Sequence, residues 1–232
     1  MDGALVLLSK FKEGPGWRNN ITPFILAGGK SRRMGTNKSF VKLGGKPLIE
    51  IIVKKVTEIF ANKPLIITNR FADYAYLDCN MVSDIVKDKG PLGGIHAGLT
   101  SASTPYIFVF ACDMPFIEKD FVDYMISRLR DEDILIPKNG ERVEPLHAIY
   151  SKRCLPAVER HLNEDHRRVQ DFFGDVNIAY VEQSEMNRLN LPEGYFINVN
   201  TVADLSKAEN CLKGTKPPNL DIVYSDRYNQ TN

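Results

Sequence analysis

The chain has 232 residues, of which 43% are hydrophobic and 25% charged, a balance ordinary for a globular protein with one sizeable core. Its 30 Lys and Arg residues stand against 29 Asp and Glu residues, and a net charge of +1 excludes recruitment of nucleic acid by the overall field. The apolar runs are too short to span a membrane or to form the core of a signal peptide. The four cysteines lie far apart without a Cys-x-x-Cys spacing, which predicts neither a cysteine zinc site nor disulfides and favours a cytoplasmic location.

The two ends of the chain differ in composition from its centre. Residues 1–20 contain the breaker cluster Glu13-Gly14-Pro15-Gly16 and are interpreted as an N-terminal extension. Residues 213–232 contain Pro217-Pro218 and no apolar periodicity, which is typical of a C-terminal tail. We therefore expect one folded domain over residues 21–212.

Strand and helix patterns alternate through the first part of this domain. Short apolar runs bounded by turn residues predict strands at 24–26, 65–68, 81–82, 106–111 and 134–136. Helical spacing and turn signals predict helices at 47–60, 93–101 and 118–130. Helices that connect successive strands make crossover units, so the sheet should be mostly parallel. The run 106–111 is the most apolar and is predicted to be a central parallel strand.

The pattern changes after Pro137. Asn139-Gly140 is a hairpin signal, and it is flanked by extended segments at 142–143 and 146–150. Further on, the sequence predicts helices at 155–162, 168–173 and 202–212 and strands at 178–181 and 195–198. We interpret this second part as an α+β cap appended to the same domain.

A glycine-rich, wholly basic segment follows the first predicted strand. It reads Leu26-Ala27-Gly28-Gly29-Lys30-Ser31-Arg32-Arg33-Met34-Gly35 and is closed by Lys38. Glycines let the backbone approach a ligand closely, and successive N–H groups in such a loop can form an anion-binding concavity. Basic side chains without a carboxylate favour a phosphate chain as the ligand, although a glycine-rich turn with solvated basic residues has the same composition. The spacing is neither that of a Walker A motif nor Gly-x-Gly-x-x-Gly.

Polar residues also follow the other predicted strands of the first part, namely Asn69, Asp84 and Asp113. Ligands of open parallel sheets bind at the carboxyl ends of the strands, so we expect these side chains near the basic loop. The Asp113 carboxylate is suited to hold Mg²⁺ against a triphosphate, and its competing role is to cap the following helix. Because Pro115 and Phe116 intervene before that helix, the metal role is favoured.

Five sequence blocks, in this order, resemble those of the molybdenum cofactor guanylyltransferases, the MobA proteins. They are the basic loop, Gly90-Pro91-Leu92-Gly93-Gly94-Ile95, Cys112-Asp113-Met114-Pro115, Glu144-Pro145-Leu146-His147-Ala148 and Asn198-Val199-Asn200-Thr201. The resemblance covers residues 22–208. It implies an α/β fold, a single three-layer α/β/α Rossmann-like nucleotidyltransferase domain with a mostly parallel sheet and the appended α+β cap. One departure is Val202, which stands where the family usually has proline.

The same resemblance implies an activity. GTP would be the nucleotide donor, molybdopterin or its molybdenum-loaded form the phosphate acceptor, and pyrophosphate and a guanine dinucleotide cofactor the products. The implied cofactor is Mg²⁺, with Asp113 as its ligand. Other cofactor-biosynthesis proteins or a recipient molybdoenzyme are the implied protein partners, with neither nucleic acid nor membrane among them.

The resemblance also assigns roles to residues. Those implied to bind the nucleotide are Leu26, Ala27, Gly28, Gly29, Lys38, Asn69, Asp84 and Asp113. Catalysis is assigned to Lys38, Arg33 and Asp113, because two phosphate anions must meet and their repulsion must be offset. No general base is assigned, since the attacking phosphate monoester is already ionised near neutral pH. The histidines are expected to be structural or surface residues, and His147 alone is expected to reach the substrate.

The acceptor side is predicted to lie in the second part of the chain. If 195–198 is a strand, alternation puts Asn198 and Asn200 on one face, where their amides can donate to a phosphate or a pterin. Their competing role is to tie the closing helix, as Asn often does. With His147, these two residues are the predicted acceptor contacts, while the first part binds GTP.

Two other functions compete with guanylyl transfer. One is a cytidylyltransferase of the same fold, acting on molybdopterin or another phosphate. The other is a non-catalytic module that binds a nucleotide or a cofactor. Lys38 and Asp113 favour an enzyme, and the glycine blocks resemble those of the guanylyl branch.

Overall fold

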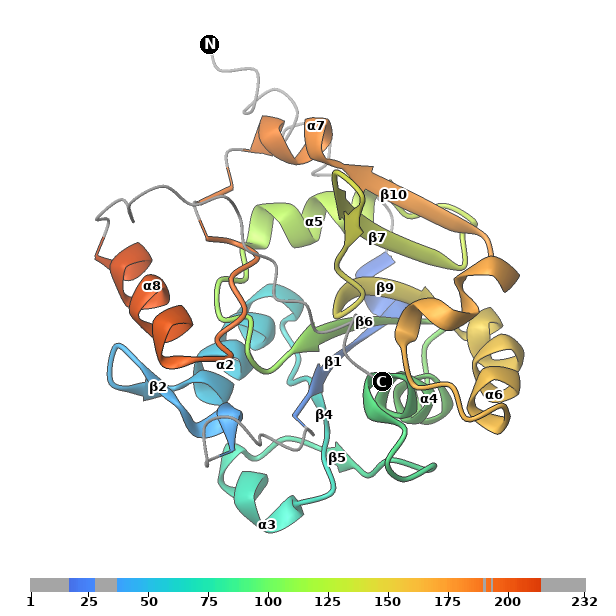
Figure 1. Ribbon diagram of the computed structural model, residues 1–232, viewed down its shortest axis with the longest axis horizontal. Helices are drawn as coiled ribbons and strands as arrows, with labels where there is room; N and C mark the ends of the chain where they lie inside the picture. The colour runs from blue at the N-terminus through green and yellow to red at the C-terminus, as the bar shows by residue number, and fades with distance from the viewer. Residues whose placement is uncertain (1–16, 28–36, 190, 193, 214–232) are drawn as a thin grey trace.

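The computed structural model describes residues 17–27, 37–189, 191–192 and 194–213 (Figure 1). The strands are β1 (Ile21–Leu26), β2 (Lys42–Leu43), β3 (Lys46–Pro47), β4 (Leu65–Ile67), β5 (Met81–Val82), β6 (Tyr106–Ala111), β7 (Ile134–Asn139), β8 (Arg142–Val143), β9 (His147–Ser151) and β10 (Ile178–Glu182). The α-helices are α2 (Leu48–Phe60), α3 (Phe71–Tyr74), α4 (Gly90–Ser101), α5 (Lys119–Arg128), α6 (Leu155–Asn163), α7 (Gln183–Met186) and α8 (Val202–Leu212). The 3₁₀-helices are η1 (Trp17–Asn20), η2 (Lys38–Phe40), η3 (Ala75–Leu77), η4 (Lys152–Cys154), η5 (Val169–Asp175) and η6 (Asn187–Leu189).

One eight-stranded sheet forms the centre of the fold, with the order β10-β7-β9-β6-β1-β4-β5 and with β8 paired to β7. β1 is parallel to β6 on one side and to β4 on the other, and β5 continues in the same direction. β9 runs antiparallel between β6 and β7, and β10 is parallel to β7. The sheet is therefore mostly parallel, as predicted. The central strand β6, however, has a parallel neighbour only on its β1 side.

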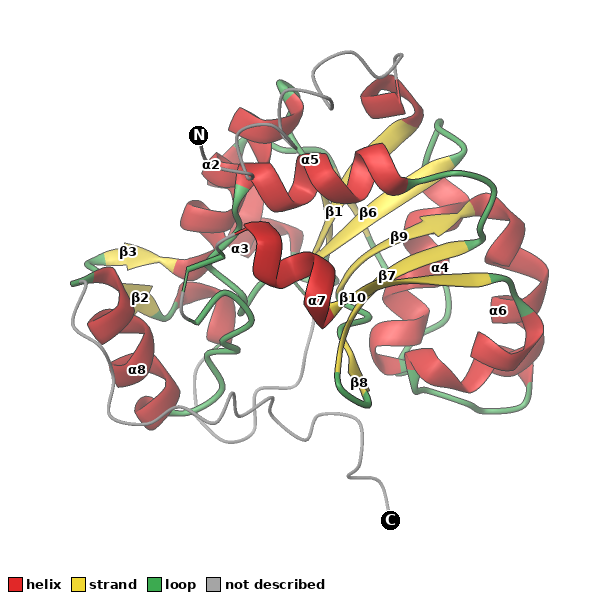
Figure 2. Ribbon diagram, turned by 90° about the horizontal axis from the view of Figure 1, so that it is seen from above, coloured by secondary structure: helices red, strands yellow, loops and turns green. Residues whose placement is uncertain are grey.

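Helices cover both faces of this sheet, which gives the predicted three layers (Figure 2). On one face, α2 and α5 are joined through Arg18, which donates to the Ile59 carbonyl at 3.1 Å and forms an ion pair with Asp123. On the other face, α4 and α6 lie side by side. α4 approaches the sheet closely because it carries glycine there, and a Cβ on Gly98 would lie 3.2 Å from Ile107 of β6.

Burial follows from this layering. Every residue of β6 is buried, because helices exclude water from both faces of the strand. α2 instead buries one stripe and exposes Lys54 and Glu58 on the other side, as its helical periodicity predicts. Among the described residues, no helix combines the length and the apolar character needed to cross a bilayer.

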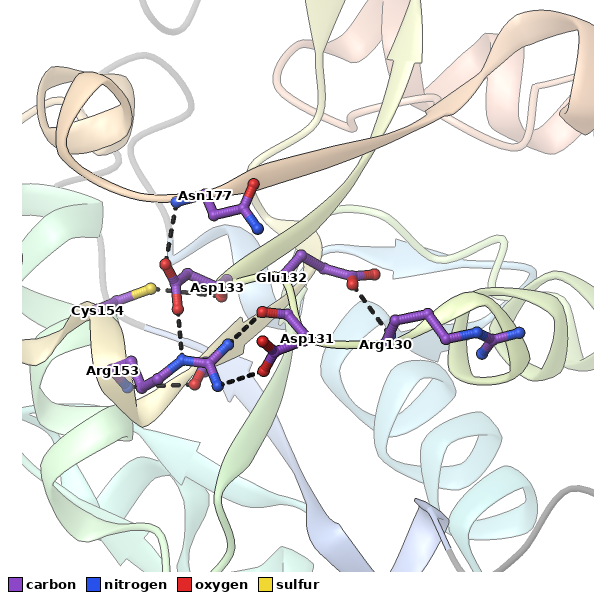
Figure 3. Close-up of polar contacts among 8 residues, drawn as sticks. Arg130, Asp131, Glu132, Asp133, Arg153, Cys154 and Asn177 are labelled. Carbon is purple, nitrogen blue, oxygen red and sulfur yellow. Dashed lines mark hydrogen bonds and ion pairs between the residues drawn. The ribbon is translucent and has the colours of Figure 1, made fainter.

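The second part of the chain extends the main sheet as well as adding helices to it, because β8, β9 and β10 join the sheet beside β7. A polar network holds the ends of these strands together (Figure 3). Arg153 donates from Nε to Asp133 at 2.6 Å and from Nη1 to Asp131 at 2.8 Å. Asp133 also accepts from the Asn177 backbone N–H at 3.0 Å. The starts of β7 and β10 are thereby tied to the residues that follow β9.

One expectation for the second part was wrong, and one predicted helix is of the 3₁₀ type. Residues 195–198 are not a strand, because their backbone closes on itself: Ile197 N–H donates to the Gly194 carbonyl at 2.8 Å. Gly194 has φ +84°, a conformation that favours glycine and redirects the chain at this point. Residues 168–173 do not form an α-helix but fall largely in the 3₁₀-helix η5.

α8 packs away from the main layers, beside the β2–β3 hairpin (Figure 2). Leu43 and Leu48 meet Val199 and Ala208 there in a small separate core. This contact brings the last described segment of the chain back to the segment that follows the basic loop. The position of α8 therefore decides where residues 198–200 lie.

Candidate functional site

The carboxyl ends of four adjacent parallel strands form the edge on which the candidate site is built, and we call it the carboxyl edge. Hydrogen bonds continue past the strand ends, from Ala27 N–H to the Ile67 carbonyl at 2.9 Å and from Cys112 N–H to the Leu26 carbonyl at 3.2 Å. Beyond β4, Thr68 N–H donates to the Val82 carbonyl at 2.9 Å.

The structure brings together at this edge the residues predicted from the strand ends, namely Leu26, Ala27, Asn69, Asp84 and Asp113. Residues 28–36, which include the predicted Gly28, Gly29 and Arg33, lie outside the described residues.

Lys38, the predicted phosphate-binding lysine, meets a residue from the far end of the chain. Its Nζ donates to the Oδ1 atom of Asn200, which is 5% exposed. The two residues are 162 positions apart, so no local sequence pattern predicts the contact. It places the fifth motif directly against the end of the first.

Asp113 is joined to the same motif through the backbone. Val199 N–H donates to the Asp113 carbonyl oxygen at 2.8 Å, and the Asp113 side chain is buried with 4% exposure. Asp113 does not cap the next helix, because Glu118 is the N-cap residue of α5. The structure therefore does not support the competing capping role.

Neither Asn198 nor Asn200 is the N-cap residue of α8, which is Thr201. α8 begins with a reciprocal capping box, in which the Thr201 hydroxyl accepts from Asp204 N–H and the Asp204 carboxylate accepts from Thr201 N–H. Asn200 contributes only its backbone N–H, 3.1 Å from the Asp204 carboxylate. Its side chain is directed at Lys38, while the Asn198 amide lies 3.5 Å from the Phe196 carbonyl.

Asn69 and Asp84 form a pair at the carboxyl edge. The Asn69 amide donates to the Asp84 carboxylate at 2.8 Å, and its oxygen accepts from the Asp84 backbone N–H at 3.1 Å. Burial raises the pKa of the Asp84 carboxyl, the Asn69 hydrogen bond opposes the rise, and the charge of Asp88 adds to it. A carboxylate in this setting gains from a hydrogen-bond donor or a cation placed against it, as a bound ligand could supply.

Glycines of the second motif have a packing role beside any role in binding. Pro91 occupies the first turn of α4, where its missing N–H costs nothing, so the helix begins at Gly90 and not at the expected residue 93. A Cβ on Gly94 would lie 2.9 Å from a methyl group of Leu26. Gly94 therefore lets α4 approach the end of β1.

Tyr74 was not predicted from the sequence, yet it ties together both described flanks of residues 28–36. Its hydroxyl lies 2.8 Å from the Ala27 carbonyl oxygen, 2.9 Å from the Ser39 hydroxyl and 3.0 Å from the Asn37 amide. The carbonyl can only accept, so the phenolic hydrogen goes to Ala27, and Ser39 and Asn37 donate to Tyr74. Burial raises the pKa of this hydroxyl, which keeps its hydrogen in place. Short α3 offers no periodicity that would have indicated the residue.

His147, predicted to contact the acceptor, is packed inside an aromatic cluster. Its ring stacks on Phe121, meets Phe108 and Phe110 edge-on, and accepts or donates one hydrogen bond at 2.8 Å to Tyr195. Only 2% of the residue is exposed, so a ligand could reach the ring only by displacing these neighbours. Burial lowers the pKa of His147 to about 3. The structure therefore supports a packing role, and we do not carry His147 forward as an acceptor contact.

Comparisons with known proteins bear on the family and the fold of this chain. Residues 23–179 match the family described as MobA-like NTP transferase domain. A protein of Peptoclostridium acidaminophilum named probable molybdenum cofactor guanylyltransferase is 38% identical over 200 residues, which cover 83% of this chain and 90% of that protein. A protein of Desulfosudis oleivorans named molybdenum cofactor guanylyltransferase is 34% identical over 195 residues, or 83% of this chain and 96% of that protein.

Among solved structures, molybdopterin-guanine dinucleotide biosynthesis protein A from Archaeoglobus fulgidus is similar to this chain with a TM-score of 0.74. It is 26% identical, and the match covers 84% of this chain and 100% of that one.

The buried state of His147 predicts a specific loss of stability in mild acid. The unfolded chain binds a proton near the ordinary histidine pKa of about 6.5, whereas the folded chain does so only near pH 3. Stability is therefore lost as the pH falls below about 6.5, by about 2 kcal/mol between pH 7 and pH 5. Urea unfolding at both pH values measures this loss.

His147→Gln is the matched variant, because glutamine does not titrate and can still accept from Tyr195. The carboxylates contribute equally to both proteins, so the wild type should lose about 2 kcal/mol more than the variant. Equal losses would show that the His147 ring is protonated in the folded protein as readily as in the unfolded one.

Proposed function

Because the chain belongs to the MobA-like NTP transferase family, we propose that it transfers GMP from GTP to the terminal phosphate of molybdopterin or of the molybdenum cofactor. Pyrophosphate leaves, and a guanine dinucleotide cofactor is formed. The names of the relatives support this choice of donor and acceptor. The observation that carries the proposal is that one segment, 198–200, contacts both the Lys38 side chain and the Asp113 backbone.

Charge is the main difficulty of this reaction. A phosphate monoester attacks the α-phosphate of GTP, and two unit charges about 4 Å apart interact by about 4 kcal/mol at an effective dielectric of 20. The Lys38 ammonium offsets this repulsion, and the basic loop with Arg33 adds further positive charge. The acceptor phosphate carries more than one negative charge near neutral pH, so the protein supplies no general base.

Asp113 fits the family's requirement for a divalent metal ion. Mg²⁺ takes oxygen ligands and is usually held by one or two carboxylates together with substrate phosphates, and Asp113 offers a buried carboxylate at the carboxyl edge. When bound there, Mg²⁺ supplies positive charge to the triphosphate. The backbone of Asp113 is fixed by its hydrogen bond from Val199, which limits the positions its carboxylate can take.

The remaining residues divide between donor and acceptor. Leu26, Ala27, Gly28 and Gly29 line the nucleotide turn in this proposal, and the Asn69–Asp84 pair binds the base or ribose. Asn200 is proposed to position the Lys38 ammonium near the acceptor, because its side chain accepts a hydrogen bond from Lys38. Asn198 remains the proposed acceptor contact from the second part of the chain.

We also propose a cellular compartment and protein partners for this activity. Widely spaced cysteines suit a reducing compartment, so we place the activity in the cytoplasm. The product is a cofactor that must pass to another protein. Other cofactor-biosynthesis proteins or a recipient molybdoenzyme are therefore the proposed partners.

Removing the charge of Lys38 or of Asp113 should slow the proposed reaction. Lys38→Met and Asp113→Asn keep the approximate size of each side chain and remove its charge. Each should lower the rate of pyrophosphate release from GTP and molybdopterin by about 10²–10³-fold. The rate is measured with Mg²⁺ and both substrates in excess, beside a thermal melting curve for each variant.

Matched controls come from an ion pair on the surface. Lys63→Met and Asp78→Asn make the same chemical changes in an ion pair that lies away from the carboxyl edge. The Lys63 Nζ atom is 2.6 Å from the Asp78 carboxylate. Both controls should retain full activity. Near-normal turnover in Asp113→Asn with an unchanged melting curve would mean that Asp113 does not hold the metal.

Tyr74 provides a further prediction. Tyr74→Phe keeps the buried ring but leaves the Ala27 carbonyl without its hydroxyl partner, so stability should fall by about 1–3 kcal/mol. Because the same hydroxyl fixes both flanks of the basic loop, GTP affinity should also fall, by about tenfold, as measured by calorimetry. The buried ring and its packing are unchanged in this variant.

Tyr124→Phe is the control for Tyr74→Phe. Its hydroxyl donates to Glu185 at 2.6 Å between α5 and α7, so this change, like Tyr74→Phe, removes the hydrogen bond that the hydroxyl donates. We expect a comparable loss of stability without a change in GTP affinity. Equal GTP affinity in the two variants would restrict Tyr74 to a purely structural role.

A further inference from the structure

The end of α6 carries a cluster of histidines and carboxylates that the proposed reaction does not use. The Nδ1 atoms of His161 and His166 lie 2.7 Å apart. One Glu164 oxygen is 3.9 Å from the Nδ1 atom of His166. The potential ligand atoms of these three residues all lie within 4.8 Å of one another.

Asp175 of η5 fixes the orientation of the first of these rings. The Nε2 atom of His161 lies 2.6 Å from the Asp175 carboxylate, which is also paired with Arg160 at 2.5 Å. A carboxylate accepts, so Nε2 of a neutral His161 ring carries the hydrogen and its Nδ1 offers a lone pair. The hydrogen of the 2.7 Å contact then lies on Nδ1 of His166, and a metal ion bound to both Nδ1 atoms would displace it. Metal-binding histidines are commonly held in this way, with one nitrogen on the metal and the other donating to a carboxylate.

The backbone of the turn is fixed as well. His166 N–H donates to the His161 carbonyl at 3.0 Å, and Asp165 has φ +64°. Lys89, the N-cap residue of α4, donates to the Leu162 carbonyl at 2.7 Å and to the Asp165 carboxylate at 2.8 Å. The three side chains of the cluster are thus presented by a turn that α6 and the start of α4 both hold in place.

We propose that His161, Glu164 and His166 bind a divalent transition metal ion, with Zn²⁺ as the best match. Two imidazole nitrogens and one carboxylate oxygen are the ligands that Zn²⁺ accepts, with water in a fourth position. Mg²⁺ prefers oxygen ligands alone, so it would not compete at this cluster. The reaction proposed at the carboxyl edge uses none of these three residues.

Binding requires a small rearrangement that the exposed residues permit. With Zn–N bonds of about 2.0–2.1 Å, two nitrogens of a tetrahedral site lie roughly 3.3 Å apart. The two Nδ1 atoms must therefore separate by roughly 0.6 Å from their 2.7 Å contact. The side chains of His166 and Glu164 are 44% and 53% exposed and can make this movement, while His161, at 11%, stays in place.

Zinc titration of the full-length protein tests the proposal. The protein is stripped with a chelator and titrated with Zn²⁺ against a chromophoric zinc indicator, with excess Mg²⁺ present to occupy oxygen-ligand sites. We expect one zinc ion per chain at this site, and a rise in melting temperature when it binds. His166→Gln and Glu164→Gln should each weaken binding by at least roughly tenfold, since even an outer partner of a metal ligand costs that much.

Asp165→Asn is the matched control. It makes the same charge change one residue away from Glu164, in a carboxylate that contacts Lys89, and asparagine tolerates its positive φ. It should bind zinc as the wild type does. Zinc that is bound equally by the wild type and His166→Gln would belong elsewhere, for example to a cysteine, and would overturn the proposal, as would a wild-type protein that binds none. Melting curves without zinc confirm that each variant is folded.

Discussion

The parallel hydrogen bonding among β6, β1, β4 and β5 is the constraint on which the candidate site depends. It ends four strands at one edge and so gathers residues from four distant stretches of the chain. β6 is buried on both faces, which fixes its position and therefore that of Asp113. Gly94 permits α4 to pack against Leu26 at the end of β1, which brings the start of α4 to the same edge.

The second part of the chain returns to this edge by way of α8. The small core between α8 and the β2–β3 hairpin carries residues 198–200 back to the start of the chain. Asn200 then contacts Lys38, and Val199 binds the Asp113 backbone. The segment 198–200 is thus in direct contact with residues of the first part of the chain.

Much of the fold was predictable from local pattern. The buried run of β6, the amphipathic stripe of α2 and the Asn139-Gly140 hairpin each have a short-range signature, and each was confirmed. Contacts between distant residues have no such signature, so Tyr74 and the Lys38–Asn200 contact could not be predicted. His147 shows the opposite error, because a residue within a family motif proved to be packed among aromatic rings. The fold is thus encoded locally to a large extent, while the candidate site depends on long-range packing.

The central claim is guanylyl transfer to a molybdopterin phosphate, and product analysis tests it most directly. The purified protein is incubated with Mg²⁺, molybdopterin and either GTP or CTP, and the dinucleotide is identified by mass spectrometry while pyrophosphate is quantified. We expect equal amounts of pyrophosphate and guanine dinucleotide with GTP, and far less product with CTP. Preferential use of CTP, or GTP binding without any dinucleotide formed, would contradict it.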